Sequence, residues 1–256
     1  MFTRAIVRDP ASTFAEGLTS GAGLGPPRFE RALEQHAAYC AALARCGLTV
    51  TSLPPDPNYP DSTFVEDTAI LTERCAVIAR PGAPSRRGEV LDMSSVIAKF
   101  YPDLLSIEEP GTLDGGDVCQ AENHFFIGLS KRTNEAGGQQ LAELLAQFDH
   151  TASFVDIRKI DSLLHLKSGL AYLGDNRLVV TEPLDHAAIP GYELIRVNSR
   201  EEYAANCIRV NDHVVLAAGY QSFAQKISEL GYQAIALDMS EFQKMDGGLS
   251  CLSLRF

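Results

Sequence analysis

Hydrophobic and polar residues follow one recurring order along this chain. Two short apolar runs, joined by a turn of two or three residues rich in Asn, Asp, Glu or Gly, precede a segment of helical periodicity and a third apolar run. Short alternating or apolar runs predict strands, and apolar positions three and four residues apart predict a helix. The order strand, strand, helix, strand occurs four times between residues 63 and 237.

Each of the four repeats opens with a predicted hairpin. The expected strand pairs are 63–71 with 75–80, 117–121 with 124–129, 169–173 with 177–181, and 206–210 with 213–217. Helices are expected at 90–100, 134–148 and 222–230, with a shorter helical piece in the third repeat. The closing strands are expected at 104–108, 153–158, 192–197 and 233–237.

The two ends of the chain supply a fifth copy only when they are combined. Residues 2–8 predict a strand, 27–46 a helix and 48–53 another strand. The missing first strand is the alternating C-terminal run that begins at Cys251, after a tight turn at 246–248. In the helix we expect one apolar stripe, formed by Phe29, Leu33, Ala37, Cys40 and Leu43.

Internal repetition of this kind predicts radial closure. We therefore expect an α/β fold in which five ββαβ modules form a propeller-like ring, with the N- and C-terminal strands sharing one module. Residues 1–256 would form a single domain. An ordinary α/β sheet with accidental regularity is the alternative, and it does not explain why the fifth copy needs both termini.

A glycine-rich segment at residues 16–27 interrupts the first module. Its Gly-Ala-Gly-Leu-Gly run is similar to a phosphate-binding loop, but it neither directly follows a strand nor opens a helix, and two prolines close it. We expect a mobile lid there rather than a nucleotide site.

Composition narrows the function classes. The formal net charge of -11 argues against nucleic acid as a partner, because phosphate binding needs a basic face. The chain has no long apolar run that would span a membrane and no apolar segment typical of a secretion signal. Its six cysteines are scattered without a Cys-x-x-Cys pair, which suits the reducing cytoplasm.

The residues at the head of each repeat are unusual for strand starts. They lie in the segments 60–67, 113–117, 163–169, 204–207 and 246–251, and include carboxylates, a histidine, an amide and a thiol. If the modules are related by rotation, these side chains meet near the axis. A thiolate attacks an electron-poor carbon, a histidine moves protons, and carboxylates hold a cation. Because several carboxylates oppose ionisation of a thiol, a positively charged, planar guanidinium suits such a site.

Each head residue also has a structural explanation when it is taken alone. Asp114 and Asp246 precede Gly-Gly and could form turns, His165 is flanked by leucines like a core histidine, and Cys251 could be a small buried hydrophobe. Glu66 and Asp67 are harder to explain, because adjacent carboxylates in an apolar strand leave one charge facing inward.

Several motifs, taken in order, carry a family resemblance across nearly the whole chain. They are Phe-Val-Glu-Asp at 64–67, Arg-Pro-Gly-Ala-x-Ser-Arg-Arg-Gly-Glu at 80–89, Pro-Gly-Thr-Leu-Asp-Gly-Gly-Asp at 110–117, Arg-Thr-Asn at 132–134, Leu-His-Leu-Lys-Ser-Gly-Leu-Ala-Tyr at 164–172 and Asp-Gly-Gly-Leu-Ser-Cys-Leu-Ser-Leu-Arg-Phe at 246–256. Together they resemble dimethylarginine dimethylaminohydrolase, a family of the guanidine-modifying pentein superfamily. The fold that this resemblance implies is a five-module ring.

The resemblance also implies roles for residues. Cys251 would be the nucleophile, His165 the general acid and base, and Asp114 the carboxylate partner of the histidine. Substrate contacts would be Leu18, Asp61, Glu66, Asp67, Arg86, Arg132 and Met245. The implied reaction is hydrolysis of asymmetric dimethylarginine or monomethylarginine to citrulline and an alkylamine through a covalent thiouronium intermediate. The partner would be a cationic amino acid, no cofactor or metal would be needed, and a homodimer is allowed.

Three alternatives use some of the same features. Arginine deiminase and agmatine deiminase share the predicted core, but their chains tend to be longer, with extra helical insertions. A non-catalytic protein that captures cationic amino acids would not need Cys251 in its motif. A metal hydrolase would need ligand-like spacing, which the six histidines lack.

Overall fold

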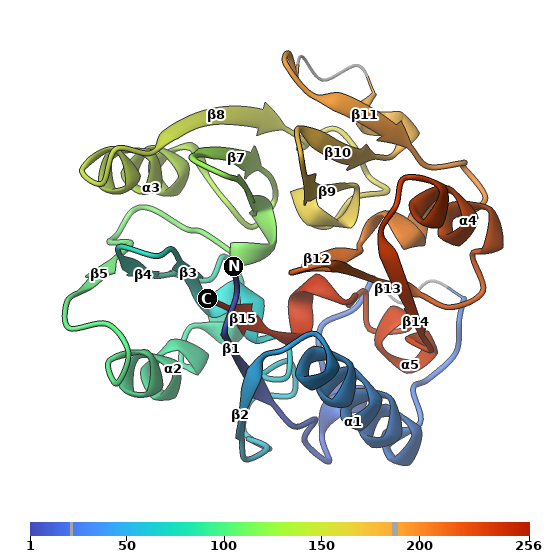
Figure 1. Cartoon of the computed structure of the whole chain (residues 1–256). Helices are drawn as coiled ribbons and strands as arrows, with labels where there is room; N and C mark the ends of the chain where they lie inside the picture. The colour runs from blue at the N-terminus through green and yellow to red at the C-terminus, as the bar shows by residue number, and fades with distance from the viewer. Residues whose placement is uncertain (21–22, 186–188) are drawn as a thin grey trace.

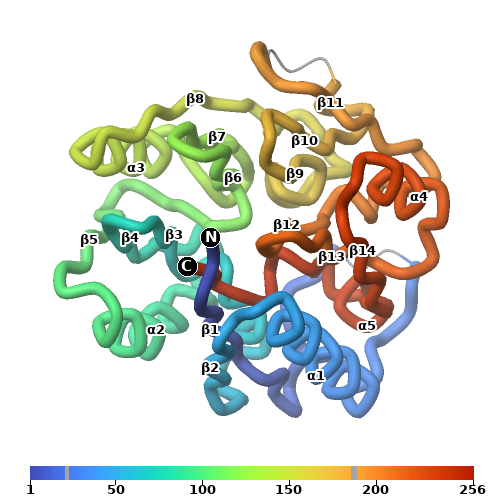
Figure 2. The backbone as a smooth tube through the Cα atoms, in the orientation of Figure 1, coloured from blue at the N-terminus to red at the C-terminus, as the bar shows by residue number. Residues whose placement is uncertain are grey.

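The computed structural model describes residues 1–20, 23–185 and 189–256. Their strands form five three-stranded sheets, which Figure 1 shows as five modules around a common centre. The backbone trace in Figure 2 places both termini near that centre. Part of the predicted lid (21–22) and part of the short helical piece in the third repeat (186–188) lie outside the described residues.

Every sheet has the same topology: the first and second strands are antiparallel, and the second and third are parallel. The four internal sheets are β3 (Ala69–Leu71), β4 (Ala76–Ile78) and β5 (Leu104–Ser106); β6 (Val118–Ala121), β7 (His124–Leu129) and β8 (Thr151–Asp156); β9 (Leu170–Gly174), β10 (Arg177–Val180) and β11 (Glu193–Arg196); and β12 (Ile208–Val210), β13 (His213–Ala217) and β14 (Gln233–Leu237).

The fifth sheet joins the two ends of the chain. Strand β1 (Arg4–Arg8) lies between β15 (Leu254–Arg255), to which it is antiparallel, and β2 (Thr49–Leu53), to which it is parallel. This sheet closes the ring, so the predicted pentein architecture is confirmed, including the module shared by the termini.

The helices lie on the rim of the ring, one for each parallel crossover in four modules (Figure 1). They are α1 (Phe29–Arg45), α2 (Glu89–Ile97), α3 (Glu135–Ala146) and α4 (Gln221–Glu229). In the module of β9 to β11, the described part of the crossover contains only a 3₁₀ helix at Glu182–Leu184. A short helix that the sequence did not predict, α5 (Ser240–Gln243), precedes the C-terminal turn. No helix in the described ranges is both long and apolar enough to cross a membrane.

The module heads are short 3₁₀ helices rather than the starts of strands. We call them the five head turns: Val65–Thr68, Gly115–Asp117, Leu166–Ser168, Glu202–Ala205 and Ser250–Leu252. Two predictions are therefore wrong in detail. The strand expected over 63–71 begins only at Ala69, and Cys251 lies within a helical turn instead of opening a strand. A 3₁₀ turn presents neighbouring side chains in different directions, so adjacent polar residues can serve different partners.

The predicted apolar stripe of α1 is also partly wrong. The buried face carries Ala32, Gln35, His36, Tyr39, Ala42 and Leu43. Leu33, placed in the stripe, is 39% exposed. The burial of Tyr39 explains the offset, because its hydroxyl donates to the carbonyl of Leu249 at 2.9 Å and lies 2.6 Å from Ser253 Oγ.

Hydrophobic contacts join neighbouring modules as well as the layers within one module. One buried cluster contains Ile6 and Leu254 from the closing sheet together with Val65, Ile78 and Met93 from the next module. The ring is therefore held by apolar packing across its module boundaries.

Replacing Leu254 by Ala tests this closure. We expect Leu254→Ala to lower the free energy of unfolding by about 2–5 kcal/mol, because it removes a buried side chain at a module boundary. Leu91→Ala is the matched control, since Leu91 is 72% exposed, and it should change stability by less than about 0.5 kcal/mol. Urea denaturation followed by circular dichroism measures both. Equal effects would show that closure of the ring does not depend on this contact.

Candidate active site

A small cavity lies where the head turns meet. It is lined by Leu18, Asp61, Phe64, Asp67, Arg86, Arg132, Leu164, His165, Met245, Asp246, Gly247 and Cys251. Its volume is about 30 Å³.

Eight of the ten predicted site residues line this cavity: Leu18, Asp61, Asp67, Arg86, Arg132, His165, Met245 and Cys251. Asp114 and Glu66 are not among the lining residues. The predictions missed four others, Phe64, Leu164, Asp246 and Gly247. Each of the four lies within two residues of a predicted site residue and inside one of the quoted motifs, so membership of the motifs was the signal that could have found them.

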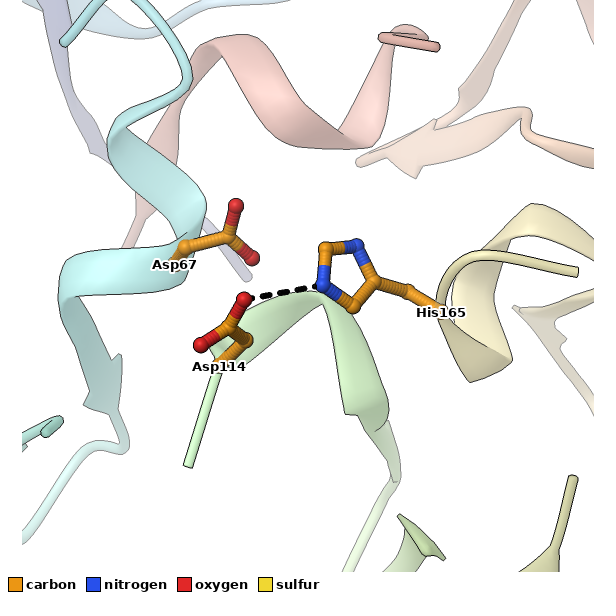
Figure 3. Close-up of side chains that lie close together, drawn as sticks. All are labelled: Asp67, Asp114 and His165. Atoms are coloured by element: carbon orange, nitrogen blue, oxygen red, sulfur yellow. Dashed lines mark hydrogen bonds and ion pairs between the residues drawn. The ribbon is translucent and has the colours of Figure 1, made fainter. Parts of the chain in front are cut away.

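Asp114 lies directly behind the imidazole of His165. Its Oδ2 is 3.0 Å from His165 Nε2, and its Oδ1 accepts the Gly82 N–H at 2.8 Å. Asp114 has no exposed surface. Figure 3 shows the carboxylates of Asp114 and Asp67 directed towards the ring from two different elements. Because the Asp114 carboxylate accepts from Nε2–H, Nδ1 is the nitrogen left to face other groups.

The surrounding carboxylates keep His165 charged. Burial alone would lower the pKa of this imidazole, but the charge of Asp67, the hydrogen bond that His165 donates to Asp114, and the charge of Asp117 outweigh it and raise the pKa to about 9. At neutral pH the ring is therefore an imidazolium. A protonated histidine can act as an acid and cannot take a proton from a thiol.

Asp67 is fixed between a cation and a backbone amide. Arg86 donates to its Oδ2 at 2.6 Å, and the Gly116 N–H donates to its Oδ1 at 2.9 Å. Burial favours the neutral acid, but the charges of His165 and Arg86 lower the pKa of Asp67 to about 2. Gly116 permits this approach, because a Cβ there would lie 2.7 Å from His165 Nδ1.

The two arginines predicted to contact substrate differ in how many of their guanidinium donors are already hydrogen-bonded. Arg86 is buried, and its guanidinium donates to Asp67, to both carboxylate oxygens of Glu89 and to the carbonyl of Phe64. Within the described ranges, no side-chain hydrogen bond or ion pair engages the guanidinium of Arg132. Arg132 is thus the arginine with donors available to a ligand.

The thiol of Cys251 is held neutral by its surroundings. Burial is the largest cause, followed by the charges of Glu66 and Asp67, and together they raise its pKa to about 12. Hydrogen bonds to Gly248 and Ser250 oppose the shift and do not cancel it.

A further buried carboxylate, which the sequence analysis did not single out, supports the histidine. Asp117 accepts the Leu166 N–H at 2.9 Å and the Ser130 hydroxyl at 2.6 Å. Burial raises the pKa of Asp117 to about 6, although the charge of His165 lowers it. Its contact with Leu166 anchors the head turn that follows His165.

The lid segment is attached to the site by its backbone. The Leu18 N–H donates to both carboxylate oxygens of Asp61, at 3.0 and 3.1 Å. Ser20 donates from its amide and its hydroxyl to Asp246. Both acceptors belong to the cavity lining, so residues 18–20 of the lid lie at the site.

One trio in the site has the composition of a metal centre. Asp67, Asp114 and His165 each offer a ligand atom, and these atoms lie within 4.8 Å of one another. The spacing of histidines along the chain could not reveal this trio, because its members come from three modules. Arg86, however, already places a buried positive charge 2.6 Å from Asp67, which is the charge that a metal ion would otherwise supply.

Comparison with known proteins agrees with this geometry. The family model described as arginine deiminase matches residues 52–190, just over half of the chain. A dimethylarginine dimethylaminohydrolase from Pseudomonas aeruginosa is 46% identical, and the match covers 100% of both chains.

Two solved structures of dimethylarginine dimethylaminohydrolase are similar over the whole chain. One is the adduct of a histidine-to-glycine variant with S-methyl-L-thiocitrulline, and the other is a cysteine-to-serine variant of the Pseudomonas aeruginosa enzyme complexed with citrulline. Each has a TM-score of 0.96 and 45% identity, with 100% of both chains covered. The predicted resemblance is confirmed, and this chain belongs to the dimethylarginine dimethylaminohydrolase family.

Proposed function

We propose that this enzyme hydrolyses Nω-methylated arginines, namely asymmetric dimethylarginine and monomethylarginine, to L-citrulline and dimethylamine or methylamine. The observation that carries the proposal is the meeting of a thiol, an imidazolium and carboxylates in one cavity of a chain that is 46% identical to a dimethylarginine dimethylaminohydrolase. The citrulline complex and thiocitrulline adduct of related enzymes support the same product and a covalent route.

The roles follow from the contacts. Cys251 is the nucleophile, and His165 is the general acid and then the general base. Asp114 orients the imidazole through its 3.0 Å contact with Nε2. Asp67 and Asp61 line the cavity and suit the guanidinium, while Arg132 suits the α-carboxylate through its free donors.

The substrate itself supplies the charge that activates the thiol. Burial and the charges of Glu66 and Asp67 raise the pKa of Cys251 to about 12, so the sulfur carries a proton at neutral pH. A bound guanidinium places a positive charge beside the sulfur and lowers the thiol pKa, and the proton leaves to solvent. Hydrolysis is thereby coupled to binding of a cation.

His165 gives and takes the protons in the steps that follow. The thiolate forms an S–C bond to the guanidinium carbon, and the imidazolium gives its proton to the departing dimethylamine as the C–N bond breaks. The neutral imidazole next takes a proton from water, whose oxygen bonds to the thiouronium carbon. Breakage of the C–S bond releases the sulfur as a thiolate, which takes the remaining O–H proton as the carbonyl of citrulline forms, so the thiol and the imidazolium are both restored.

The match to the arginine deiminase model keeps that activity as the second candidate. Both reactions attack the same carbon, and they differ in which amine leaves. We propose the methylated substrates because the relative that is 46% identical over the full chain is named a dimethylarginine dimethylaminohydrolase.

The proposed domain, compartment, partner and metal-free mechanism rest on less specific observations. The pairing of β1 with β15 supports one domain over residues 1–256. All six cysteines are free, which supports a cytoplasmic setting. The acidic net charge of -11 supports a small cationic partner over nucleic acid. We propose that no metal takes part, since Arg86 already neutralises Asp67.

A substrate panel decides between the two activities. The enzyme should release dimethylamine from asymmetric dimethylarginine much faster than ammonia from arginine, with both amines quantified by mass spectrometry. Monomethylarginine should give methylamine. Preferential release of ammonia from arginine would assign the protein to the deiminases.

Cys251→Ser tests the nucleophile. We expect turnover to fall below detection, because a serine hydroxyl in this acidic cavity is not ionised by a bound guanidinium. Binding of dimethylarginine, measured by calorimetry, should stay within about threefold of the unmodified enzyme. Substantial remaining activity would remove Cys251 from the mechanism.

Asp114→Asn tests the orientation of the imidazole. The variant removes a group that raises the pKa of His165, so that pKa should fall from about 9. We expect kcat/KM to drop about 10²–10⁴-fold and its alkaline limb to move to lower pH. Titration of the His165 ring by NMR gives the pKa directly. An unchanged profile would show that another group sets the charge of the histidine.

A further inference from the structure

The guanidinium of Arg132 has donors available to a ligand, but its backbone is firmly held. Arg132 lies between β7 and α3, in a short segment of residues 130–133 that we call the Arg132 loop. The N–H groups of Arg132 and Thr133 both donate to Ser130 Oγ, at 2.9 and 3.0 Å. The Ser130 N–H donates to the Thr133 carbonyl at 3.0 Å. The Ser130 hydroxyl is therefore the centre of the Arg132 loop.

A buried carboxylate fixes the direction of this hydroxyl. Ser130 Oγ donates to Asp117 Oδ2 at 2.6 Å, and the Leu166 N–H donates to Asp117 Oδ1 at 2.9 Å. Asp117 and Leu166 have no exposed surface. A Cβ at Gly128 would lie 3.0 Å from Asp117 Oδ1, so the glycine there leaves room for the carboxylate. Asp117 thus joins the Arg132 loop to the head turn that begins at Leu166.

The hydrogen bonds of Ser130 require an acceptor on each oxygen of residue 117. A serine oxygen has two lone pairs and one proton. Both lone pairs accept backbone amides of the Arg132 loop, so the proton goes to Asp117. The other oxygen of Asp117 already accepts an amide. A carboxylate suits both donors, whereas the side-chain amide of asparagine would place a donor against one of them.

Asp114, the carboxylate that orients His165, is linked to the same loop. Its N–H donates to Thr133 Oγ1 at 3.1 Å, and its Oδ1 accepts the Gly82 N–H at 2.8 Å. Gly82 packs against the backbone of Arg132, since a Cβ on this glycine would overlap the Arg132 carbonyl oxygen. The spacing between the imidazole and the available guanidinium is therefore set by a buried framework of two carboxylates.

We propose that Asp117 is a positioning residue that acts through Ser130 to fix Arg132 relative to His165, and that this spacing gives the enzyme its preference for guanidines with an α-carboxylate. The assignment of the α-carboxylate to Arg132 rests on the proposed function. A guanidinium and a carboxylate pair best in a two-pronged geometry, which tolerates little displacement. A guanidine that lacks the carboxylate makes no use of Arg132 and does not depend on this spacing.

The test compares two substrates in Ser130→Ala. One is asymmetric dimethylarginine, and the other is its decarboxylated analogue, dimethylagmatine. Loss of the hydroxyl releases the Arg132 amide, so KM for dimethylarginine should rise about tenfold while kcat stays within about threefold. For the decarboxylated analogue, kcat/KM should stay within about threefold. The preference for the carboxylated substrate should thus fall about tenfold.

Two further variants make this result specific. Ser228→Ala is the matched control, because it removes a serine hydroxyl from the exposed side of α4 and should leave the preference unchanged. In an Arg132→Met background, Ser130→Ala should change the preference by less than half of its effect in the unmodified chain. Equal losses for both substrates would show that Ser130 serves the fold or the imidazole instead, and would overturn the proposal. An unchanged preference in Ser130→Ala would overturn it too.

Asp117→Asn tests the other end of the same hydrogen bond. It should lower the preference in the same direction as Ser130→Ala. It should also lower the pKa of His165, because the charge of Asp117 raises that pKa, and NMR titration of the ring measures the change. If Ser130→Ala does not fold, Ser130→Cys replaces it, since sulfur is a weak acceptor for the two amides. A folded variant at either position that keeps the full preference would contradict the proposal.

This test and the substrate panel fail separately. If the enzyme releases ammonia from arginine instead, the comparison is made with arginine and agmatine, and Ser130→Ala should still lower the preference for the carboxylated compound. If the unmodified enzyme does not prefer a carboxylated substrate, the inference about Asp117 is wrong, whereas hydrolysis of methylated guanidines still stands.

Discussion

The closing sheet is the constraint on which the rest of the structure depends. Strand β15 has two residues, and it pairs Leu254 with Ile6 and Arg255 with Ala5. Phe256 adds backbone bonds to the first strand and packs its ring 5.1 Å from that of Phe100 in the next module. Since Cys251 precedes this strand by three residues, the contacts that close the ring also set the position of the thiol. Fold and site are therefore specified together.

A ring closed in this way brings the head turns to one axis, and the charges they carry must then be balanced in a small buried volume. Asp67, Asp114 and Asp117 are all buried around His165. Isolated carboxylates would be costly there, so each has backbone or hydroxyl donors, and the imidazolium and Arg86 provide the positive charge. A charged His165 is thus part of the stable arrangement, and it leaves no neutral base to ionise the thiol.

The sequence predicts the module order well, because strand and helix periodicity are local properties. It also identifies the chemistry of the heads, since carboxylates at 66 and 67 and the histidine at 165 interrupt apolar segments. The 3₁₀ turn at Val65–Thr68 was missed because it continues directly into a strand without a glycine or proline to mark the change. A turn of this length leaves no periodic signal.

Sequence analysis could not predict the side-chain contacts between modules. Glu66 bonds to Lys167, 101 residues away, and to Ser250, 184 residues away. No spacing rule connects such residues, and the motif around Glu66 does not identify Lys167 and Ser250 as its partners. The offset face of α1 has a similar cause, because Tyr39 is buried by partners near the far end of the chain. Partners in distant segments, not local propensity, decide these side chains.

The charge balance of the cavity also gives the proposed reaction a direction. The substrate is a cation that ionises the sulfur, whereas citrulline has a neutral ureido group and does not offset the effect of Glu66 and Asp67 on the thiol pKa. Once the product forms, the sulfur regains its proton and is no longer a nucleophile. The same carboxylates therefore keep the sulfur protonated both before the cation binds and after the neutral product forms.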